Sequence, residues 1–365
     1  MITGGGTGGH VSPALAILEE LRRRDPQLLV QWLGRKGGME ARAAREQGVP
    51  FRALPVAPWP RHSKLRRGWV ALKLAVGAVQ AALCIRRFRP QLMAGVGGYV
   101  SLPALWAAQR LGVPTVIHEQ NKRLGMANRF LAPHATRVFL SYEATAQGLP
   151  EDRTRVVGNP VRAGFAKPPD KAVARERFGL DPAAPVVLVA GGSQGAHSIN
   201  EAVAGALGRF ERGRLQLLWM TGEADYPRYE AIAEQAAPDV RLFRYISDMP
   251  GACAAADLIV CRAGASTSAE LAMLGRAAIL VPYPHAAENH QEENARAFEE
   301  AGAAVLLHDA DCTADTLADH ITGLLAAPDR LDEMARAAAG LARPLAAEAI
   351  VEEIITLVFG EAQGA

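Results

Sequence analysis

Short apolar segments alternate along this chain with longer segments in which apolar residues recur at helical spacing. The short segments predict buried strands and the longer ones predict amphipathic helices. In the first half the predicted strands are 28–33, 92–96, 115–118 and 137–140, and the predicted helices are 13–24, 39–47, 69–87, 102–111 and 126–131. Such alternation is typical of a parallel sheet with helices on both faces.

This alternation breaks once and then resumes. Gly, Asn and Pro residues between 158 and 170 predict a linker. Beyond it the predicted strands are 186–190, 215–220, 240–243, 258–261, 278–282 and 304–307, and the predicted helices are 199–209, 266–274 and 291–301. The 365 residues also exceed what one hydrophobic core usually supports. We therefore predict an α/β protein with two doubly wound, Rossmann-like domains, residues 1–160 and 161–340.

Composition narrows the class of protein only slightly. A content of 49% hydrophobic and 21% charged residues is typical of a globular protein, and a net charge of +2 favours no nucleic-acid partner. The four cysteines have no metal-binding spacing, which predicts reduced thiols in a cytosolic protein. No signal peptide is apparent. Only three residues precede the first glycine turn, so either the first strand is unusually short or the natural start lies upstream.

Three glycine-rich turns each follow a predicted strand and precede a predicted helix. They are residues 4–10 (GGGTGGH), 95–99 (GVGGY) and 191–195 (GGSQG). Without a Cβ in the way, main-chain amides and the positive end of the helix dipole can surround a phosphate. Two such turns in the first half and one in the second predict two phosphate-handling domains that face each other across a cleft, with a diphosphate on each side of the reaction.

A fourth helix start carries candidate nucleotide ligands. The amides of Ala265, Ser266 and Thr267 begin a predicted helix after a glycine and can hold a diphosphate. Glu270 follows one turn later, where its carboxylate can accept hydrogen bonds from ribose hydroxyls. Ser, Thr and Glu at a helix start also form an ordinary capping arrangement, and this alternative stays open.

Two residues are candidates for a general base. His10 ends the first glycine turn, and imidazole accepts protons readily near neutral pH, although a capping or packing role is the alternative. Glu119 ends a predicted strand and would bring a carboxylate to the same rim. One base and a stabilised leaving group suffice for a single inverting displacement, and no second carboxylate nucleophile is apparent. We expect no metal or other cofactor, because a helix dipole can stabilise the departing diphosphate.

Six motifs occur along the chain in a recognisable order. They are residues 4–10 (GGGTGGH), 97–101 (GGYVS), 118–121 (HEQN), 157–162 (VGNPVR), 191–196 (GGSQGA) and 262–270 (RAGASTSAE). In this order they resemble the MurG family, membrane-associated N-acetylglucosaminyltransferases of bacterial peptidoglycan synthesis. The resemblance covers nearly the whole chain and weakens after about Ala310. It implies a GT-B fold in which the last helix, within 341–361, packs back on the N-terminal domain.

The resemblance also implies substrates and contacts. N-acetylglucosamine would pass with inversion from UDP-N-acetylglucosamine to the muramoyl-pentapeptide of a polyprenyl-diphosphate lipid. The implied contacts are Thr7, Gly8 and Gly9 in the first turn, Asn121 and Gln291 on the donor sugar, Ser193 on phosphate, and Arg162 with the backbone of Ile246 near the uracil. It assigns donor roles to Ala265, Ser266, Thr267 and Glu270 as well. His290 stands where some relatives carry Gln, and it receives no role.

A basic and apolar stretch follows residue 60. Residues 61–67 and 86–89 are rich in Lys and Arg, and an apolar segment of helix length lies between them, interrupted by Lys73. A charge near the middle argues against a span, whereas the pattern fits a helix at a membrane interface with anionic lipids. A core helix with a solvated basic end is the alternative. Given a lipid-linked acceptor, we expect peripheral contact with the cytoplasmic side of the inner membrane.

Two other functions stay open from the sequence. Gly4, Gly6 and Gly9 match the G-x-G-x-x-G fingerprint of a dinucleotide oxidoreductase. No acidic residue follows the second strand, which disfavours NAD, but Arg35 and Lys36 could hold the 2′-phosphate of NADP. A glycine turn in the second half argues against this use, because one dinucleotide does not need it. A non-catalytic scaffold at the membrane surface is the third hypothesis.

Overall fold

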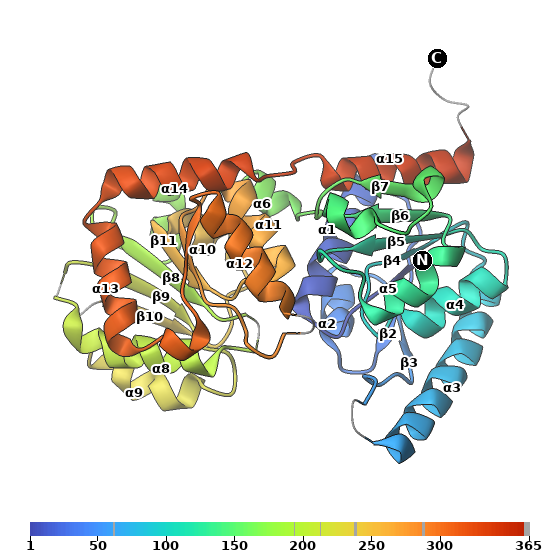
Figure 1. The fold of residues 1–365 in the computed structure, drawn as a ribbon, viewed down its shortest axis with the longest axis horizontal. Coiled ribbons are helices and arrows are strands. Elements are labelled where there is room, and N and C mark those ends of the chain that lie inside the picture. Colours follow the sequence, from blue (N-terminus) through green and yellow to red (C-terminus); the bar gives the residue numbers. More distant parts are fainter. Residues whose placement is uncertain (61–62, 193, 212, 237–238, 287–288, 361–365) are drawn as a thin grey trace. The chain divides into compact units, whose positions relative to one another are not determined.

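The structure, a computed structural model, describes residues 1–60, 63–192, 194–211, 213–236, 239–286 and 289–360. The chain divides into two compact units (Figure 1). The first unit comprises Met1–Ala163 together with Arg343–Ala365, and the second comprises Gly164–Ala342. Each unit is built around one parallel β-sheet.

The first unit contains a seven-stranded sheet in the order β3-β2-β1-β4-β5-β6-β7, and all neighbours are parallel. Its strands are β1 (Ile2–Thr3), β2 (Trp32–Arg35), β3 (Phe51–Leu54), β4 (Met93–Gly95), β5 (Thr115–Glu119), β6 (Arg137–Leu140) and β7 (Thr154–Val156). Its helices are α1 (Gly8–Arg24), α2 (Met39–Glu46), α3 (Lys64–Phe88), α4 (Leu102–Arg110), α5 (Met126–Leu131) and α15 (Ala346–Phe359), and α6 (Ala163–Ala166) begins at the boundary between the units.

The second unit contains a six-stranded parallel sheet in the order β10-β9-β8-β11-β12-β13. Its strands are β8 (Val186–Ala190), β9 (Gln216–Met220), β10 (Asp239–Phe243), β11 (Leu258–Cys261), β12 (Ala278–Leu280) and β13 (Ala304–Leu306). Its helices are α7 (Lys171–Arg177), α8 (His197–Ala206), α9 (Tyr226–Glu234), α10 (Met249–Ala255), α11 (Ala265–Leu274), α12 (His290–Glu300), α13 (Ala314–Leu325) and α14 (Pro328–Gly340).

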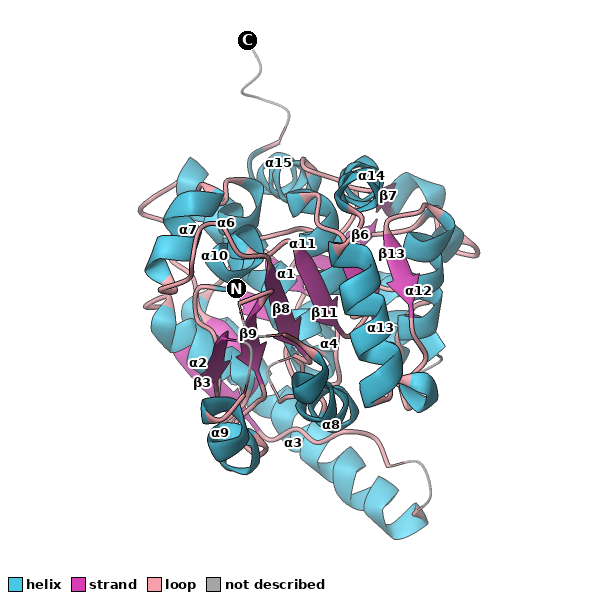
Figure 2. Cartoon of the chain, turned by 90° about the vertical axis from the view of Figure 1, so that its left-hand side faces the viewer, coloured by secondary structure: helices cyan, strands magenta, loops and turns pink. Residues whose placement is uncertain are grey.

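The central strands are buried on both faces, which explains why their sequences read as continuous apolar runs. In the second unit, alternate residues of β8, β9 and β11 join one apolar cluster with α8 and α13. Figure 2 shows helices on both sides of these strands. In the first unit, Ile350, Val351 and Ile354 of α15 complete a cluster with α1, and Arg137, the first residue of β6, pairs with Glu353 at 3.0 Å.

The order of the strands places two switch points, one in each sheet. In the first sheet the chain runs outward from β1 to β3 and then returns to β4 on the other side of β1. In the second sheet it runs from β8 to β10 and returns to β11 beside β8. Open α/β sheets bind ligands at the carboxyl ends of strands where the order reverses. The loops at these positions follow β1, β4, β8 and β11, and they carry the three glycine turns and the start of α11.

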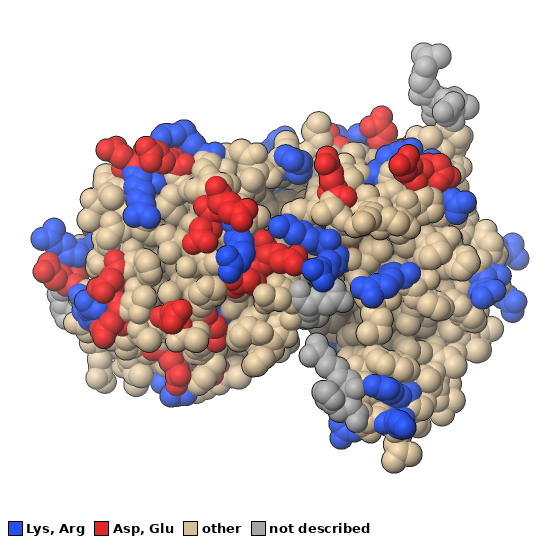
Figure 3. Space-filling view, viewed as in Figure 1, with Lys and Arg blue, Asp and Glu red and all other residues tan. Residues whose placement is uncertain are grey.

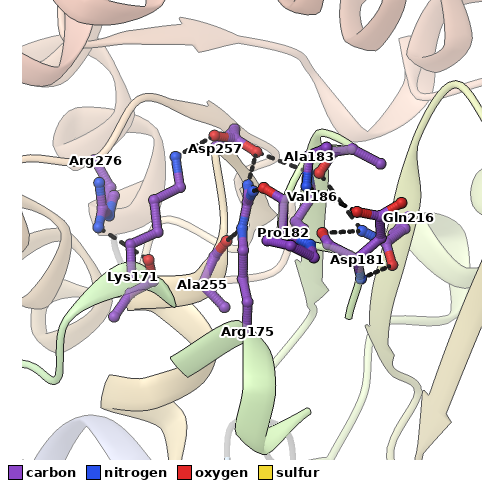
Figure 4. Close-up of polar contacts among 12 residues, drawn as sticks. Lys171, Arg175, Asp181, Pro182, Ala183, Val186, Gln216, Ala255, Asp257 and Arg276 are labelled. Atoms are coloured by element: carbon purple, nitrogen blue, oxygen red, sulfur yellow. Dashed lines mark hydrogen bonds and ion pairs between the residues drawn. The ribbon is translucent and has the colours of Figure 1, made fainter. Parts of the chain in front are cut away.

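A polar cluster ties the first helix of the second unit to the start of its sheet (Figure 4). Asp257, just before β11, accepts hydrogen bonds from the Val186 amide at 2.7 Å and from Arg175 Nη2 at 2.6 Å. Lys171 Nζ contacts its other oxygen at 2.5 Å. Arg175 is only 8% exposed and also donates to the carbonyl of Ala255. The cluster anchors α7 at the edge of the sheet opposite the switch-point loops.

Every predicted strand and helix of the alternating pattern overlaps an observed one, and 126–131, 137–140, 186–190 and 258–261 have the predicted bounds. Among the strands the largest shift is in β2, which begins at Trp32 and not at residue 28. β3 and β7, which have only four and three residues, were not predicted, and neither were several helices of the second unit, such as α13 and α14. One difference bears on the site: α1 begins at Gly8, not at residue 13. The first amides of a helix need no intrahelical partner, so Gly-Gly-His can form its first turn despite poor helix propensity. His10 therefore lies inside the helix rather than at the end of the turn.

Candidate functional site

The first two glycine turns lie against each other at the switch point of the first sheet. A Cβ on Gly98 would approach the carbonyl oxygen of Gly5 to 2.5 Å, and one on Gly6 would approach Tyr99 Cε1 to 3.1 Å. Gly6, Gly97 and Gly98 also have positive φ angles of 88°, 85° and 78°. Larger residues would therefore be excluded both by space and by backbone conformation. The two turns form one continuous surface of main chain.

His10 lies on this surface. Its ring packs against the second turn, since a Cβ on Gly97 would lie 3.1 Å from His10 Cδ2 and 3.3 Å from Nε2. Its Nδ1 is 2.9 Å from Thr7 Oγ1, the N-cap residue of α1. If Nδ1 carries the ring proton and donates a hydrogen bond to Thr7 Oγ1, then Nε2 is the basic nitrogen. The sequence-predicted residues Thr7 and His10 are thus in direct contact, with Gly8 and Gly9 between them.

Glu119, at the end of β5, is buried and occupied by hydrogen bonds. Its Oε1 accepts from the main-chain and side-chain nitrogens of Asn121 at 3.1 and 2.9 Å. Its Oε2 accepts from the Gly125 amide and from Asn128 Nδ2, both at 2.9 Å. These four hydrogen bonds tie the 120–125 loop and Asn128 to the end of β5.

His118 is buried behind this loop and stays neutral. Burial lowers its pKa to about 4. Its Nδ1 lies 2.9 Å from Gln120 Nε2, which can only donate, so Nε2 carries the proton and donates to the Gly158 carbonyl at 3.0 Å. His118 thereby connects β5 to the segment that leads out of the first unit.

In the second unit α11 begins at Ala265, directly after a glycine. The N-cap is Gly264, which has no side chain, so the helix lacks a side-chain cap at this position. Ala265 and Ser266 are buried, and Thr267 and Glu270 are half-buried. Burial, together with the charge of Glu270, raises the pKa of Cys261 at the end of β11 to about 12.

The third glycine turn packs on the neighbouring strand end. A Cβ on Gly195 would lie 2.0 Å from the carbonyl oxygen of Thr221, and one on Gly222 would lie 2.6 Å from the Gly195 amide. Only glycines allow the turn to lie this close to β9. Ser193, the expected phosphate contact in this turn, lies outside the described residues.

Gln291 is oriented by the loop after β12. Its Oε1 accepts a hydrogen bond from the Tyr283 amide at 2.9 Å, so its amide N–H groups are its remaining donors. Asn294, one turn further along α12, donates to the Ala263 carbonyl at 3.0 Å. This bond holds the start of α12 next to the start of α11. The loop itself is fixed by Arg262, which donates to the carbonyls of Val281 and Pro282.

The two residues expected near the uracil lie in different units. Ile246 is buried in the second unit, and its amide lies 3.3 Å from Met220 Sδ, a weak acceptor. Arg162 lies at the end of the first unit. Among the residues that the structure describes, no group of three His, Cys, Asp or Glu side chains could hold a metal ion.

Sequence reasoning did not identify two buried polar residues that shape the first site. Asn128 donates to both the His118 carbonyl and Glu119 Oε2. Glu40 accepts a hydrogen bond from the amide of Gly6, inside the first glycine turn. The only signal for Glu40 is an acidic residue at a helix start that follows a pair of glycines, which is a common pattern. Gly6 is distant from Glu40 in sequence, and a loop separates Asn128 from its partners at the end of β5, so spacing alone could not reveal these contacts.

Comparisons with known proteins match both units. The N-terminal domain of glycosyltransferase family 28 matches residues 1–140, and its C-terminal domain matches residues 186–350. A UDP-N-acetylglucosamine--N-acetylmuramyl-(pentapeptide) pyrophosphoryl-undecaprenol N-acetylglucosamine transferase from Exiguobacterium sp. is 39% identical over 97% of this chain and 99% of its own. A second transferase of that name, from Bacillus thuringiensis, is 35% identical over 98% of this chain and 99% of its own.

A solved structure agrees with these relatives. The crystal structure of MurG from Acinetobacter baumannii is 31% identical in sequence and superposes with a TM-score of 0.72. The similarity covers 97% of this chain and 98% of that protein.

Proposed function

We infer the mechanism from the premise that this chain belongs to the MurG family, within glycosyltransferase family 28. It has the GT-B fold and is a hexosyltransferase. It transfers N-acetylglucosamine from UDP-N-acetylglucosamine to N-acetylmuramyl-pentapeptide pyrophosphoryl-undecaprenol, which is a step of peptidoglycan synthesis. Identity of 39% along the whole chain is the observation that carries this conclusion. The roles of individual residues are our proposal.

We assign the donor to the second unit. The amides of Ala265, Ser266 and Thr267 would bind the diphosphate at the start of α11, where the helix dipole favours negative charge. Glu270 would accept hydrogen bonds from the ribose hydroxyls, and the N–H groups of Gln291 would donate to hydroxyls of the sugar. Ser193 and the backbone of Ile246 complete the donor contacts proposed in the second unit, and Arg162, which the resemblance also puts near the uracil, belongs to the first unit. As the glycosidic bond to UDP breaks, the amides at the helix start would stabilise the charge on the leaving diphosphate.

We assign the acceptor and the base to the first unit. The joined surface of the first two glycine turns would hold the acceptor diphosphate, with Thr7, Gly8 and Gly9 next to it. With Nδ1–H of His10 donating a hydrogen bond to Thr7 Oγ1, His10 Nε2 would accept the proton of the attacking muramoyl hydroxyl. The oxygen then attacks the anomeric carbon from the face opposite UDP, which inverts the configuration. Glu119 would shape the loop that presents Asn121 to the donor sugar.

We propose that α3 docks the enzyme on anionic membrane. Large apolar residues on this helix are exposed at spacings of three and four, which places them on one stripe: Leu65, Trp69, Leu72, Val76, Val79 and Leu83. The opposite stripe, which includes Val70, Ala78 and Ile85, is buried in the first unit. A helix packed on one side in this way fits an interface better than a span, although its apolar window has a mean hydropathy of 1.7 and is long enough to cross.

The charge on α3 supports the same proposal. The helix contains six Lys or Arg residues and no Asp or Glu: Lys64, Arg66, Arg67, Lys73, Arg86 and Arg87. In Figure 3 the surface over α3 carries blue side chains and no red ones. Each basic group near an anionic lipid surface contributes about 1 kcal/mol. Arg61 and His62, which belong to the predicted basic stretch, lie outside the described residues.

The alternative functions have less support. The relatives at 39% and 35% identity are N-acetylglucosamine transferases, and nothing in their names points to a dinucleotide oxidoreductase. A scaffold would need neither the α11 start nor the oriented Gln291.

A transfer assay tests the proposal directly. Radiolabelled UDP-N-acetylglucosamine and a polyprenyl-diphosphate muramoyl-pentapeptide are the substrates, and rates are measured against pH for the wild type, His10→Ala and the exposed-site control His134→Ala. Loss of a general base lowers kcat by about 100-fold or more and removes the fall in rate at low pH. We expect this only for His10→Ala, with the KM for the donor little changed. A His10→Ala variant that keeps the low-pH limb would exclude His10, and saturable NADPH binding without transfer would favour the oxidoreductase.

A further inference from the structure

Glu40 is a fully buried carboxylate next to the first glycine turn. Its side chain has no exposed surface, and it lies in the first turn of α2. Its Oε2 accepts a hydrogen bond from the Gly6 amide at 3.1 Å, and its Oε1 accepts one from the Arg35 amide at 2.8 Å. Within the described ranges, no Lys, Arg or His side chain pairs with it. The negative charge is therefore stabilised by main-chain amides and by the amino end of a helix.

The space around Glu40 exists only because three neighbours are glycines. A Cβ on Gly5 would lie 2.3 Å from Glu40 Cδ, one on Gly34 would lie 2.6 Å from Cγ, and one on Gly38 would lie 2.5 Å from Oε1. Three separate backbone segments thus close on this one side chain. Burial of a carboxylate costs free energy unless its oxygens accept hydrogen bonds. The glycines leave room for a side chain of this length, and its two oxygens reach the amides of Gly6 and Arg35.

The contacts of Glu40 lead directly to His10. The Gly6 amide that it holds belongs to the residue before Thr7, and Thr7 Oγ1 is 2.9 Å from His10 Nδ1. The Gly5 carbonyl, on the other side of Gly6, touches the second glycine turn at Gly98. Gly5 and Gly6 both have positive φ angles, and flexible glycines keep one conformation only if something fixes them.

We propose that Glu40 is a positioning residue for the transfer reaction. Its carboxylate fixes Gly5 and Gly6, and through them it fixes the Thr7–His10 pair against the second glycine turn. It also takes the Gly6 amide out of the set that can bind the acceptor diphosphate. This inference rests on the proposed function only in treating His10 as the base.

The test is a double-mutant cycle between Glu40→Gln and His10→Ala. Glutamine has the same length, but its NH2 group cannot accept, so one of the two amides loses its partner. A base displaced by about 1 Å can lose a factor of roughly 100 in rate. We expect kcat of Glu40→Gln to fall about 10- to 100-fold, with the donor KM and the Kd for UDP within about twofold of wild type. In the His10→Ala background the same change should cost less than about threefold, because the group it positions is gone.

Glu46→Gln is the matched control, since Glu46 is on the same helix but is 59% exposed and pairs with Arg42 at the surface. It should leave all constants unchanged. A Glu40→Gln variant with wild-type kcat, or one that costs the same factor with and without His10, would overturn the proposal. If this variant does not fold by circular dichroism, the cycle is repeated with Glu40→Asp, which keeps the charge, and the same outcomes apply. Failure of His10 as the base is visible separately, in the rate of His10→Ala alone.

Discussion

At the scale of single residues, two buried carboxylates of this enzyme form hydrogen bonds with main-chain amides. Glu119 accepts hydrogen bonds from the amides of Asn121 and Gly125, and Glu40 accepts them from Gly6 and Arg35. Each carboxylate fixes a loop at the carboxyl end of a strand. The groups proposed to meet the substrates, such as His10 and Gln291, are half-buried and lie nearer the surface than these carboxylates.

Removal of the Glu270 carboxylate should weaken donor binding specifically. Hydrogen bonds to a charged group contribute about 1.5–3 kcal/mol, so Glu270→Ala should raise the donor KM roughly 10- to 150-fold. The measurement is the KM for UDP-N-acetylglucosamine at saturating acceptor. Glu300→Ala, which alters an exposed glutamate on α12, is the control and should change nothing. A donor KM unchanged in Glu270→Ala would contradict the ribose contact.

His118 should make stability depend on pH in mildly acidic solution. Its pKa is about 4 in the folded protein because of burial, against an ordinary value of 6.5. Between these values the unfolded chain binds more protons, so the free energy of unfolding falls as pH drops from 6.5 to 4, by about 3 kcal/mol from this residue. In urea titrations His118→Gln should lose this dependence, and the exposed-site variant His134→Gln should keep it. An equal slope in wild type and His118→Gln would refute the prediction.

At the scale of elements, both faces of α3 are apolar, so hydrophobic content alone does not tell which face is buried and which is exposed. The stripe with Val70, Ala78 and Ile85 packs on the first unit, and the stripe with Trp69 and Val76 is exposed. Small residues line part of the buried stripe, where the helix approaches its neighbours closely. Gly77, for example, lies so near the Pro55 carbonyl that a Cβ would approach it to 3.0 Å.

A charge on the exposed stripe should weaken membrane binding without affecting the fold. Val76→Asp removes an apolar contact and adds repulsion of about 1 kcal/mol from anionic lipid, so binding to phosphatidylglycerol vesicles should fall at least about fivefold in sedimentation. Val173→Asp is the matched control, because both valines are 43% exposed and Val173 lies on α7 of the second unit. Equal vesicle binding by the two variants would argue against docking through α3.

The cluster around Asp257 should stabilise the second unit. Asp257→Ala would leave Arg175, only 8% exposed, without its carboxylate, and breaking such a buried pair costs about 3 kcal/mol or more. We expect a lower melting temperature for this variant. Asp315→Ala breaks a pair in which the aspartate is 84% exposed and should cost less than about 1 kcal/mol. A melting temperature that is the same in both variants would show that the cluster adds no stability.

At the scale of the whole molecule, the chain leaves the first unit at Ala163 and returns to it at Arg343. The first unit is therefore made from both ends of the sequence, whereas the second is one continuous segment. α15 contributes Ile350, Val351 and Ile354 to the core that also contains Ile17 and Leu18 of α1.

Deletion of residues 343–365 should abolish sugar transfer but leave UDP binding. Loss of three buried aliphatic side chains removes roughly 5 kcal/mol or more from the first unit. Transfer should be abolished, while UDP binding by calorimetry should persist because the second unit is intact. A shorter deletion of 361–365, which keeps α15, is the control and should retain transfer. Loss of UDP binding in the longer deletion would contradict the assignment of the donor to the second unit.

The sequence by itself determined the α/β class, the central strands and the places of the glycine turns. Buried parallel strands need continuous apolar runs, as in 186–190, and a strand that ends in glycines signals a close main-chain approach. Apolar runs and glycines at strand ends are local features, so they can be read directly from the order of residue types. The family motifs, read in order, also indicated the reaction.

Only the tertiary structure decided which of these residues meet. The contact of His10 with the second glycine turn and the contact of Glu40 with Gly5 join segments distant in sequence. The four hydrogen bonds on Glu119 come from residues two to nine positions away, and the fold of the loop brings them to one carboxylate. From the sequence, His10 was favoured as the general base and Glu119 was its rival. The structure shows that Glu119 is buried and accepts four hydrogen bonds, whereas His10 is half-buried. Our choice of His10 as the base stays a proposal for the transfer assay to test.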